Sequence, residues 1–257
     1  MEIIIVIIAS VFASLITLFS GFGLGTILTP VFVLFFPIEI AIALTGIVHL
    51  LNNVFKFVLL GKHAQWKVVL QFGIPSMVGA FIGAKLLLSL TVFMPIASYH
   101  FLGKEFFIEP VKLSIAILMI YFALAEVFPA LQSFKPTLAA LPAGGLLSGF
   151  VGGFSGHQGA LRSIFLIRYG LLKEQFLATG IVVACLVDFT RISLYAQQLL
   201  ASNAVQHWNV VAAAVISAFI GAYAGSKLLN KITLGLVQKI VTVMLILIAV
   251  GLGSGLI

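Results

Sequence analysis

Charged residues are scarce in this chain. Asp, Glu, Lys and Arg together make up 8% of its 257 residues, against about 25% in an ordinary soluble domain. Hydrophobic residues make up 62% of the sequence, which is more apolar surface than a water-soluble fold of this length can hide. The composition therefore excludes an ordinary soluble protein and predicts that lipid is the solvent for much of the surface.

Cysteine is almost absent, and so are the residue clusters that catalysis needs. The one cysteine, Cys185, excludes an internal disulfide. The sequence has no His-x-x-x-His motif, no paired carboxylates within an apolar run and no nucleotide-binding motif. We therefore predict that the protein is not an enzyme and that it uses no metal or cofactor.

Basic residues outnumber acidic ones, 14 to 7, and give a net charge of +7. They are scattered singly between apolar runs, without the basic stripe and interleaved aromatic residues that nucleic-acid binding requires. Scattered cations in loops instead fit the positive-inside bias of membrane proteins. The lipid bilayer is the expected partner, and nucleic acid is not.

Long apolar runs dominate the chain. A helix that spans the ~30 Å core of a bilayer needs about 20 residues, and six segments reach or approach that length: 38–60, 67–90, 111–131, 174–200, 208–230 and 234–256. Two longer segments, 3–36 and 137–169, are interrupted by the glycine clusters 21–25 and 152–156. We predict an all-α, multi-pass integral membrane protein with about eight hydrophobic segments, whose longest extramembrane loop runs from Thr91 to Pro110.

The segments repeat. The sequence GAFIGAK at 79–85 recurs as GAYAGSK at 221–227, with a tryptophan 13 residues before each copy, and the Thr-Gly pair at 45–46 recurs at 179–180. A period of this kind indicates a duplicated structural unit. We predict two repeats of four segments, 1–131 and 137–257, joined by a linker at 132–136, with a glycine-broken first segment in each.

The relative orientation of the repeats stays open at this stage. As one helix, each broken segment would be about 50 Å long, well beyond the bilayer core. If the segment crosses the membrane, the repeats are parallel; if it doubles back, they are inverted. Lysine and arginine divide eight to three between the two sides under either arrangement, and both arrangements place the two termini outside.

The glycine breaks predict an anion site. Freed backbone groups in lipid need partners, so breaks persist where the backbone lines a cavity, and a helix that starts after a break presents N–H groups and a positive dipole end to an anion. The predicted substrate-binding glycines are Gly21, Gly23, Gly25, Gly153 and Gly156. The alternative is that glycines only permit close helix packing, which we favour for the glycines at 79, 83, 221 and 225.

Three polar residues follow the second break. Arg162 lies one helical turn beyond Gln158, and its planar donor fork suits an oxyanion. Its alternative role is to extend toward the membrane interface. His157 is predicted either to bind the anion or carry a proton, or to be a hydrogen-bonded structural group.

Asp188 and Arg191 lie one turn apart within an apolar run and are expected to form an ion pair. The pair is either structural or a switch, in which Asp188 takes a proton or Arg191 exchanges Asp188 for the substrate. Asn52 and Asn53 hold the matching place in the first repeat. We expect Thr45 and Thr179 to add hydroxyl groups to the same cavity, with helix contacts as their alternative role. For His49 too, a place in the cavity and a structural role are both open.

These motifs resemble the sulfite exporter TauE/SafE family of membrane permeases. The resemblance covers nearly the whole chain and rests on GFGLG at 21–25 followed by Pro30, on the duplicated 79–85 motif, and on GFSGHQGALRS at 153–163. It implies export of a small anion across the cell membrane, sulfite or an organosulfonate. The polar residues of the second break have no counterpart in the first.

Together these observations predict a secondary membrane transporter for a small anion, with proton coupling as one source of driving force. Two alternatives stay open, an anion channel and a membrane partner subunit without transport activity. Saturable, coupled flux distinguishes a transporter from a channel. Retained function after changes at Asp188 and Arg162 would indicate the partner subunit.

Overall fold

The computed structural model describes residues 2–17, 24–128, 137–201, 208–228 and 234–257. Its longer helices are α1 (Glu2–Thr17), α2 (Leu24–Val33), α3 (Ile38–Leu60), α5 (Ile74–Leu90), α6 (Pro110–Val127), α7 (Leu141–Ser155), α8 (Gly159–Arg168), α9 (Lys173–Ala201), α10 (Trp208–Leu228) and α11 (Leu234–Gly253). Short helical turns, η1 (Gly61–His63), α4 (Trp66–Val68), η2 (Val69–Gly73) and η4 (Leu138–Ala140), precede α5 and α7. Within these described ranges, five helices are long and apolar enough to cross a membrane: Ile38–His63, Trp66–Leu90, Leu138–Ser155, Lys173–Leu200 and Trp208–Gly225.

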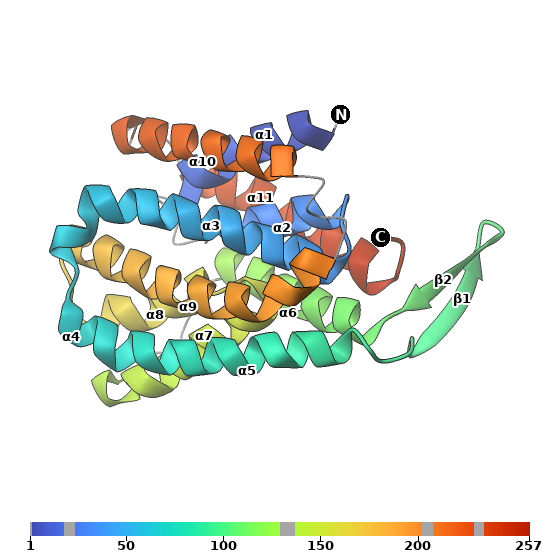
Figure 1. The fold of residues 1–257 in the computed structure, drawn as a ribbon, viewed down its shortest axis with the longest axis horizontal. Coiled ribbons are helices and arrows are strands. Elements are labelled where there is room, and N and C mark those ends of the chain that lie inside the picture. Colours follow the sequence, from blue (N-terminus) through green and yellow to red (C-terminus); the bar gives the residue numbers. More distant parts are fainter. Residues whose placement is uncertain (1, 18–23, 129–136, 202–207, 229–233) are drawn as a thin grey trace.

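The helices run along one common axis (Figure 1). Both termini lie at one end of the bundle, where a β-hairpin projects, and α4 lies at the opposite end. We refer to these as the hairpin end and the α4 end. The chain is thus a helical, multi-pass membrane protein, as its composition predicts.

The second broken segment doubles back on itself. Gly144 of α7 lies beside Phe165 of α8, and the Ser148 hydroxyl donates a hydrogen bond of 3.1 Å to the carbonyl of Gln158. α7 ends at Ser155, and the residue after it, Gly156, has a φ of +81°, in the left-handed region that favours glycine. The break therefore lies at 156–158, later than the predicted 152–156, and α1 and α2 are likewise antiparallel neighbours on either side of residues 18–23 (Figure 1).

Four pairs of helices form the main contacts between the two halves of the chain: α1 with α10, α5 with α7, α3 with α9, and α6 with α11. α3 and α9 are antiparallel, because His49 contacts Asp188 while Gln65 contacts Thr179. α5 and α7 are parallel, because Gly145 meets Phe72 and Gly153 meets Ala80.

Glycines set the close approach of α5 and α7. Backbone meets backbone along this contact: a Cβ built on Gly149 would lie 1.9 Å from the carbonyl oxygen of Ser76, and one on Gly153 would lie 2.1 Å from that of Ala80. Gly153 is therefore a packing residue inside α7, a correction to its predicted place in the break. Gly79 and Gly83 face the α7 backbone in the same way.

Gly149→Ala is expected to push α5 and α7 apart, because the added methyl group collides with a backbone oxygen that cannot move alone. Overpacking of this kind costs about 1–3 kcal/mol, which thermal unfolding in detergent would detect as a lower midpoint. Gly251→Ala is the matched helical control, since its nearest neighbour is the flexible Ile257 side chain at 3.2 Å. Equal midpoints for the two variants would contradict this account of the contact.

The loop predicted at Thr91–Pro110 contains two strands, β1 (Ala97–Phe101) and β2 (Lys104–Ile108), paired antiparallel with Ala97 opposite Ile108. Leu102 and Gly103, both at positive φ, form the turn. The hydroxyl of Tyr99 donates to the carbonyl of Ser254, 2.8 Å away, and so joins the hairpin to the end of α11. The described residues are otherwise helical, so the all-α fold class is confirmed and the hairpin is a local addition in the predicted extramembrane loop.

Candidate functional site

Polar side chains gather in the middle of the bundle, where α2, α3, α9 and the gap between α7 and α8 meet. We call this group the polar cluster. Its members are at most 6% exposed although they lie among apolar helices: Thr29, Thr45, His49, Asn53, His157, Gln158, Asp188 and Arg191.

Asp188 is the hub of the cluster. Its carboxylate accepts hydrogen bonds from His49 Nδ1, from Arg191 Nε at 2.9 Å and from Gln158 Nε2 at 3.3 Å. Arg191 Nη2 also forms an ion pair with Asp188, 2.8 Å from Oδ1, the oxygen that Arg191 Nε and Gln158 Nε2 contact. Three elements, α3, α9 and the α7–α8 gap, are thereby joined through one acidic side chain.

The His49 ring also contacts Asn53. The Asn53 amide nitrogen lies 3.2 Å from His49 Nδ1 and 3.3 Å from Nε2, one helical turn along α3. Since Nδ1 donates to the Asp188 carboxylate, Nε2 is the ring nitrogen that can accept from Asn53. This arrangement fixes the ring between an amide of its own helix and a carboxylate of α9.

The two glycine breaks meet beside Arg191. A Cβ built on Gly25, in the first turn of α2, would lie 2.8 Å from the carbonyl oxygen of Gly156. A Cβ on Gly156 would lie 3.2 Å from Arg191 Nη1 and 3.3 Å from the Thr29 hydroxyl, and a Cβ on Gly46 would lie 3.3 Å from the guanidinium carbon. Small residues on three elements therefore make room for one guanidinium group.

Several hydrogen-bonding atoms around this point are buried without a partner among the described residues: Thr29 Oγ1, Thr45 Oγ1, His157 Nε2, Gln158 Oε1 and Arg191 Nη1. A buried polar atom without a partner costs about 1–3 kcal/mol, so their concentration here calls for a functional explanation. Thr29, Thr45 and Arg191 can each donate a hydrogen bond from these atoms, and an acceptor would satisfy them. Gln158 Oε1 is an acceptor, and so is His157 Nε2 when Nδ1 donates to the Ser155 carbonyl.

His157 is held in the gap rather than aimed into solvent. Its Nδ1 lies 2.9 Å from the carbonyl oxygen of Ser155, and its ring stacks on Phe122 of α6 at a centroid distance of 6.3 Å. Arg162 extends from α8 toward the α4 end, where its Nε would lie 3.4 Å from a Cβ on Gly180. Arg162 Nη1 is also buried without a partner among the described residues.

Some predicted residues lie away from the meeting of the breaks. Thr179 accepts a 3.0 Å hydrogen bond from the backbone N–H of Gln65 near the α4 end, and Asn52 accepts one of 3.2 Å from the Ser14 hydroxyl of α1. Thr179 therefore has a structural contact, in line with its alternative role, and Asn52 contacts α1. Gly21 and Gly23 lie outside the described residues.

Thr29 is a cluster member that the sequence prediction missed. It follows Gly25 by one turn of α2, so the glycine break and a hydroxyl one turn later were the available signal. The pairing of His49 with Asp188, across 139 residues, had no signal in the sequence.

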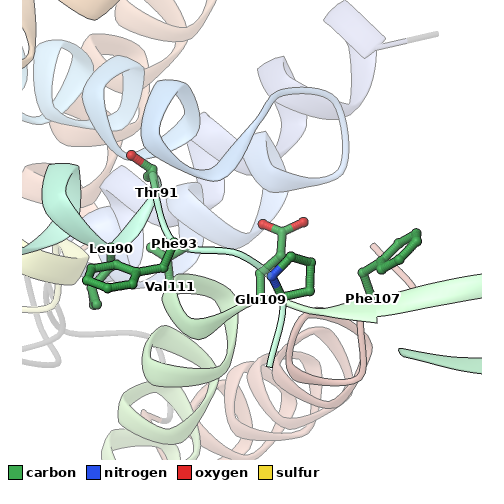
Figure 2. A pocket seen from close by; sticks show the side chains of 7 residues that line it. Leu90, Thr91, Phe93, Phe107, Glu109 and Val111 are labelled. Carbon is green, nitrogen blue, oxygen red and sulfur yellow. The ribbon is translucent and has the colours of Figure 1, made fainter. Parts of the chain in front are cut away.

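A separate pocket of about 420 Å³ opens at the hairpin end, between the end of α5 and the base of the hairpin (Figure 2). Its lining is mainly apolar and consists of Leu90, Thr91, Phe93, Pro95, Phe107, Glu109 and Val111. The one charged side chain in it is a carboxylate. None of its lining residues belongs to the polar cluster, so the pocket is distinct from it.

Comparison with known proteins gives one match. The family described as "Sulfite exporter TauE/SafE" matches residues 6–252. Searches among curated proteins and among solved structures each found no match. The family match spans nearly the entire chain, including both glycine breaks and every residue of the polar cluster, and so the chain belongs to the sulfite exporter TauE/SafE family of membrane transporters.

Proposed function

We propose that the protein is a secondary transporter of the cell membrane that carries a small oxyanion, sulfite or an organosulfonate, through the polar cluster. The observation that carries this proposal is that Arg191 Nη1 and the hydroxyl groups of Thr29 and Thr45 are buried donors without a partner among the described residues, close to Gly156. A sulfur oxyanion offers several acceptor oxygens to a guanidinium fork and to hydroxyl groups at once. Sulfite is the substrate that the family description names.

The gap between α7 and α8 adds backbone donors to the site. α8 begins at Gly159, directly after the gap, and the first N–H groups of a helix have no partner within it. Together with the positive end of the helix dipole they favour an anion at this point. α2 begins close by, at Leu24, so both breaks support the same site.

We propose that the two halves, 1–131 and 137–257, are inverted repeats. Three observations support this. α1 and α7 run in opposite directions (Figure 1), the contact of α1 with α10 has its counterpart in that of α7 with α5, and the equivalent helices α3 and α9 pair antiparallel. A two-fold axis in the membrane plane relates such halves, and transporters with inverted repeats place their substrate at the repeat interface.

The distribution of cations supports one orientation in the membrane. Lys62, Lys67, Arg168 and Lys173 belong to the α4 end, whereas Lys85, Lys104 and Lys112 belong to the hairpin end. Cytoplasmic loops carry the excess of Lys and Arg. We therefore place the α4 end in the cytoplasm and both termini outside.

Proton coupling through Asp188 is part of the proposal. The carboxylate holds Arg191 and His49 at the same time, and a proton on Asp188 would release both. Arg191 would then be free to bind an anion, and loss of the proton would return it to Asp188. Because Arg191 alternates between Asp188 and the anion, each proton that binds Asp188 is linked to the movement of an anion.

Arg191→Lys is expected to lower kcat/KM for sulfite at least ~10-fold, because lysine keeps the charge next to Asp188 but loses the two-pronged donor geometry. Initial rates of labelled sulfite uptake into proteoliposomes measure this. Arg168→Lys, in the exposed last turn of α8, is the matched control and should retain the wild-type rate. A wild-type kcat/KM in the Arg191 variant would show that the guanidinium group is not part of the anion site.

A further inference from the structure

Two further cations lie on the α4 side of Asp188. Lys56 of α3 is 6% exposed, and no hydrogen bond or ion pair to it is found among the described residues. Arg162 of α8 is half-buried, and its Nη1 is buried without a partner among the described residues.

These cations are separated from Arg191 along both central helices. Lys56 lies ten residues beyond Gly46, the residue that contacts Arg191, and therefore about 15 Å further along α3. On α9, the Nε of Arg162 lies against Gly180, eight residues or about 12 Å before Asp188, whereas Arg191 lies one turn after it. Along the helix axes, Asp188 therefore lies between Arg191 on the one hand and Lys56 and Arg162, toward the α4 end, on the other.

Asp188 forms its hydrogen bonds and ion pairs with other groups than Lys56 and Arg162. It is the one carboxylate among the buried residues that the structure describes, and it is already bonded to His49, Arg191 and Gln158. Unpaired cations inside a membrane protein normally face a partner or a substrate path. A small oxyanion can accept from an ammonium group with one oxygen and from a guanidinium with another.

We propose that Lys56 and Arg162 form a second anion site, on the cytoplasmic side of Asp188, which an oxyanion such as sulfite occupies before it reaches Arg191. This inference rests on the proposed function. The Asp188–His49 pair would then separate two sites, so that an anion passes from one to the other when Asp188 exchanges partners.

The number of sulfite ions bound per chain tests the second site. Labelled sulfite binding to the purified, full-length protein in detergent is expected to saturate at two per chain in the wild type and at one in Lys56→Met. Lys56→Arg should retain two, because it keeps the charge. The control Lys62→Met, which removes an exposed lysine at the same end, should also retain two. Size-exclusion profiles and thermal unfolding show whether each variant is folded.

Transport kinetics give a second readout. With the cytoplasmic side facing the labelled pool, Lys56→Met is expected to raise the KM for sulfite at least ~10-fold, while the KM measured from the opposite side stays within ~2-fold. If the methionine variant does not fold, Lys56→Arg replaces it in this measurement. The KM for sulfite from the cytoplasmic side is then expected to rise by a smaller factor, while the KM from the opposite side stays unchanged.

The outcomes separate the two proposals. One sulfite per wild-type chain that Lys56→Met retains would overturn the second site and leave the central site standing. One sulfite per wild-type chain that Lys56→Met loses would assign the single site to Lys56 and overturn the two-site inference together with the central site. No sulfite bound by the folded wild type would overturn the proposed function together with the second site. Equal KM shifts from both sides would place Lys56 at the central site and also overturn the inference.

Discussion

Asp188→Asn is expected to abolish proton-coupled sulfite transport and to destabilise the protein. Asparagine keeps the size of the side chain but removes the negative charge that faces Arg191 and His49. Breaking a buried ion pair by removing one partner costs about 3–5 kcal/mol, because the remaining charge is left uncompensated. Initial rates in proteoliposomes and thermal unfolding in detergent measure the two effects.

The exposed pair Glu109–Lys112 is the matched control for this change. It has the same i,i+3 spacing and an N–O distance of 3.0 Å, but its side chains are 37% and 23% exposed. Glu109→Gln should therefore cost at most about 1 kcal/mol and leave transport intact. The double variant Asp188→Asn/Arg191→Gln should recover part of the stability and none of the transport. Gradient-driven uptake at the wild-type rate in Asp188→Asn would contradict the switching role of the pair.

Gly156→Ala is expected to reduce sulfite transport by at least ~100-fold. The new methyl group would lie 3.2 Å from Arg191 Nη1 and 3.3 Å from the Thr29 hydroxyl, and so would fill the space in which the proposed anion meets its donors. The backbone at φ +81° adds strain, which for a residue with a Cβ costs about 1–2 kcal/mol.

Gly170→Ala separates these two effects. Gly170 has φ +72°, but a Cβ built there would meet nothing within 4 Å, so the variant carries the backbone strain without the obstruction. We expect Gly170→Ala to lose stability and to keep transport. Similar transport rates in the two alanine variants would show that strain alone accounts for the Gly156 effect and would remove Gly156 from the substrate path.

The spans were predictable because a bilayer imposes length and apolarity on each helix. Residues 38–60 were predicted as a segment and form α3 with the same bounds, and 174–200 became α9 to within one residue at each end. The position of the second break was predicted a few residues too early, because Gly153 was assigned to the break although it packs against α5. Contacts between distant segments leave no signature in local periodicity.

The site was predictable in part for the same reason. Asp188 and Arg191 stand out in an apolar run, since an unpaired charge in lipid is too costly to be incidental. Their partner His49 lies on another helix, and nothing in the spacing of the chain selects it. The direction of the repeats was undetermined because the doubling-back and crossing arrangements divide the cations equally. The turn at Gly156 and the antiparallel course of α3 and α9 are the observations on which our proposal of inverted repeats rests.

The arrangement favours a transporter over an open channel. The carboxylate of Asp188 ties three elements together at the meeting of the two breaks, so an anion that reaches Arg191 must displace an existing partner. Each anion that displaces a partner of Arg191 completes one coupled step with a fixed stoichiometry, whereas ion flow through an open pore requires no such step. A partner subunit without transport activity would have no use for buried donors that lack partners.

The central claim is that one oxyanion binds at Arg191 and crosses the membrane in exchange for a change at Asp188. Counterflow tests it most directly: proteoliposomes loaded with unlabelled sulfite are diluted into a trace of labelled sulfite, with the wild type and Gly156→Ala compared and Gly170→Ala as control. The account predicts transient accumulation of label above equilibrium in the wild type and in Gly170→Ala, competition by organosulfonates, and no accumulation in Gly156→Ala. Label that equilibrates without overshoot in the wild type would indicate a channel, and absence of any flux from folded protein would contradict anion transport by this chain.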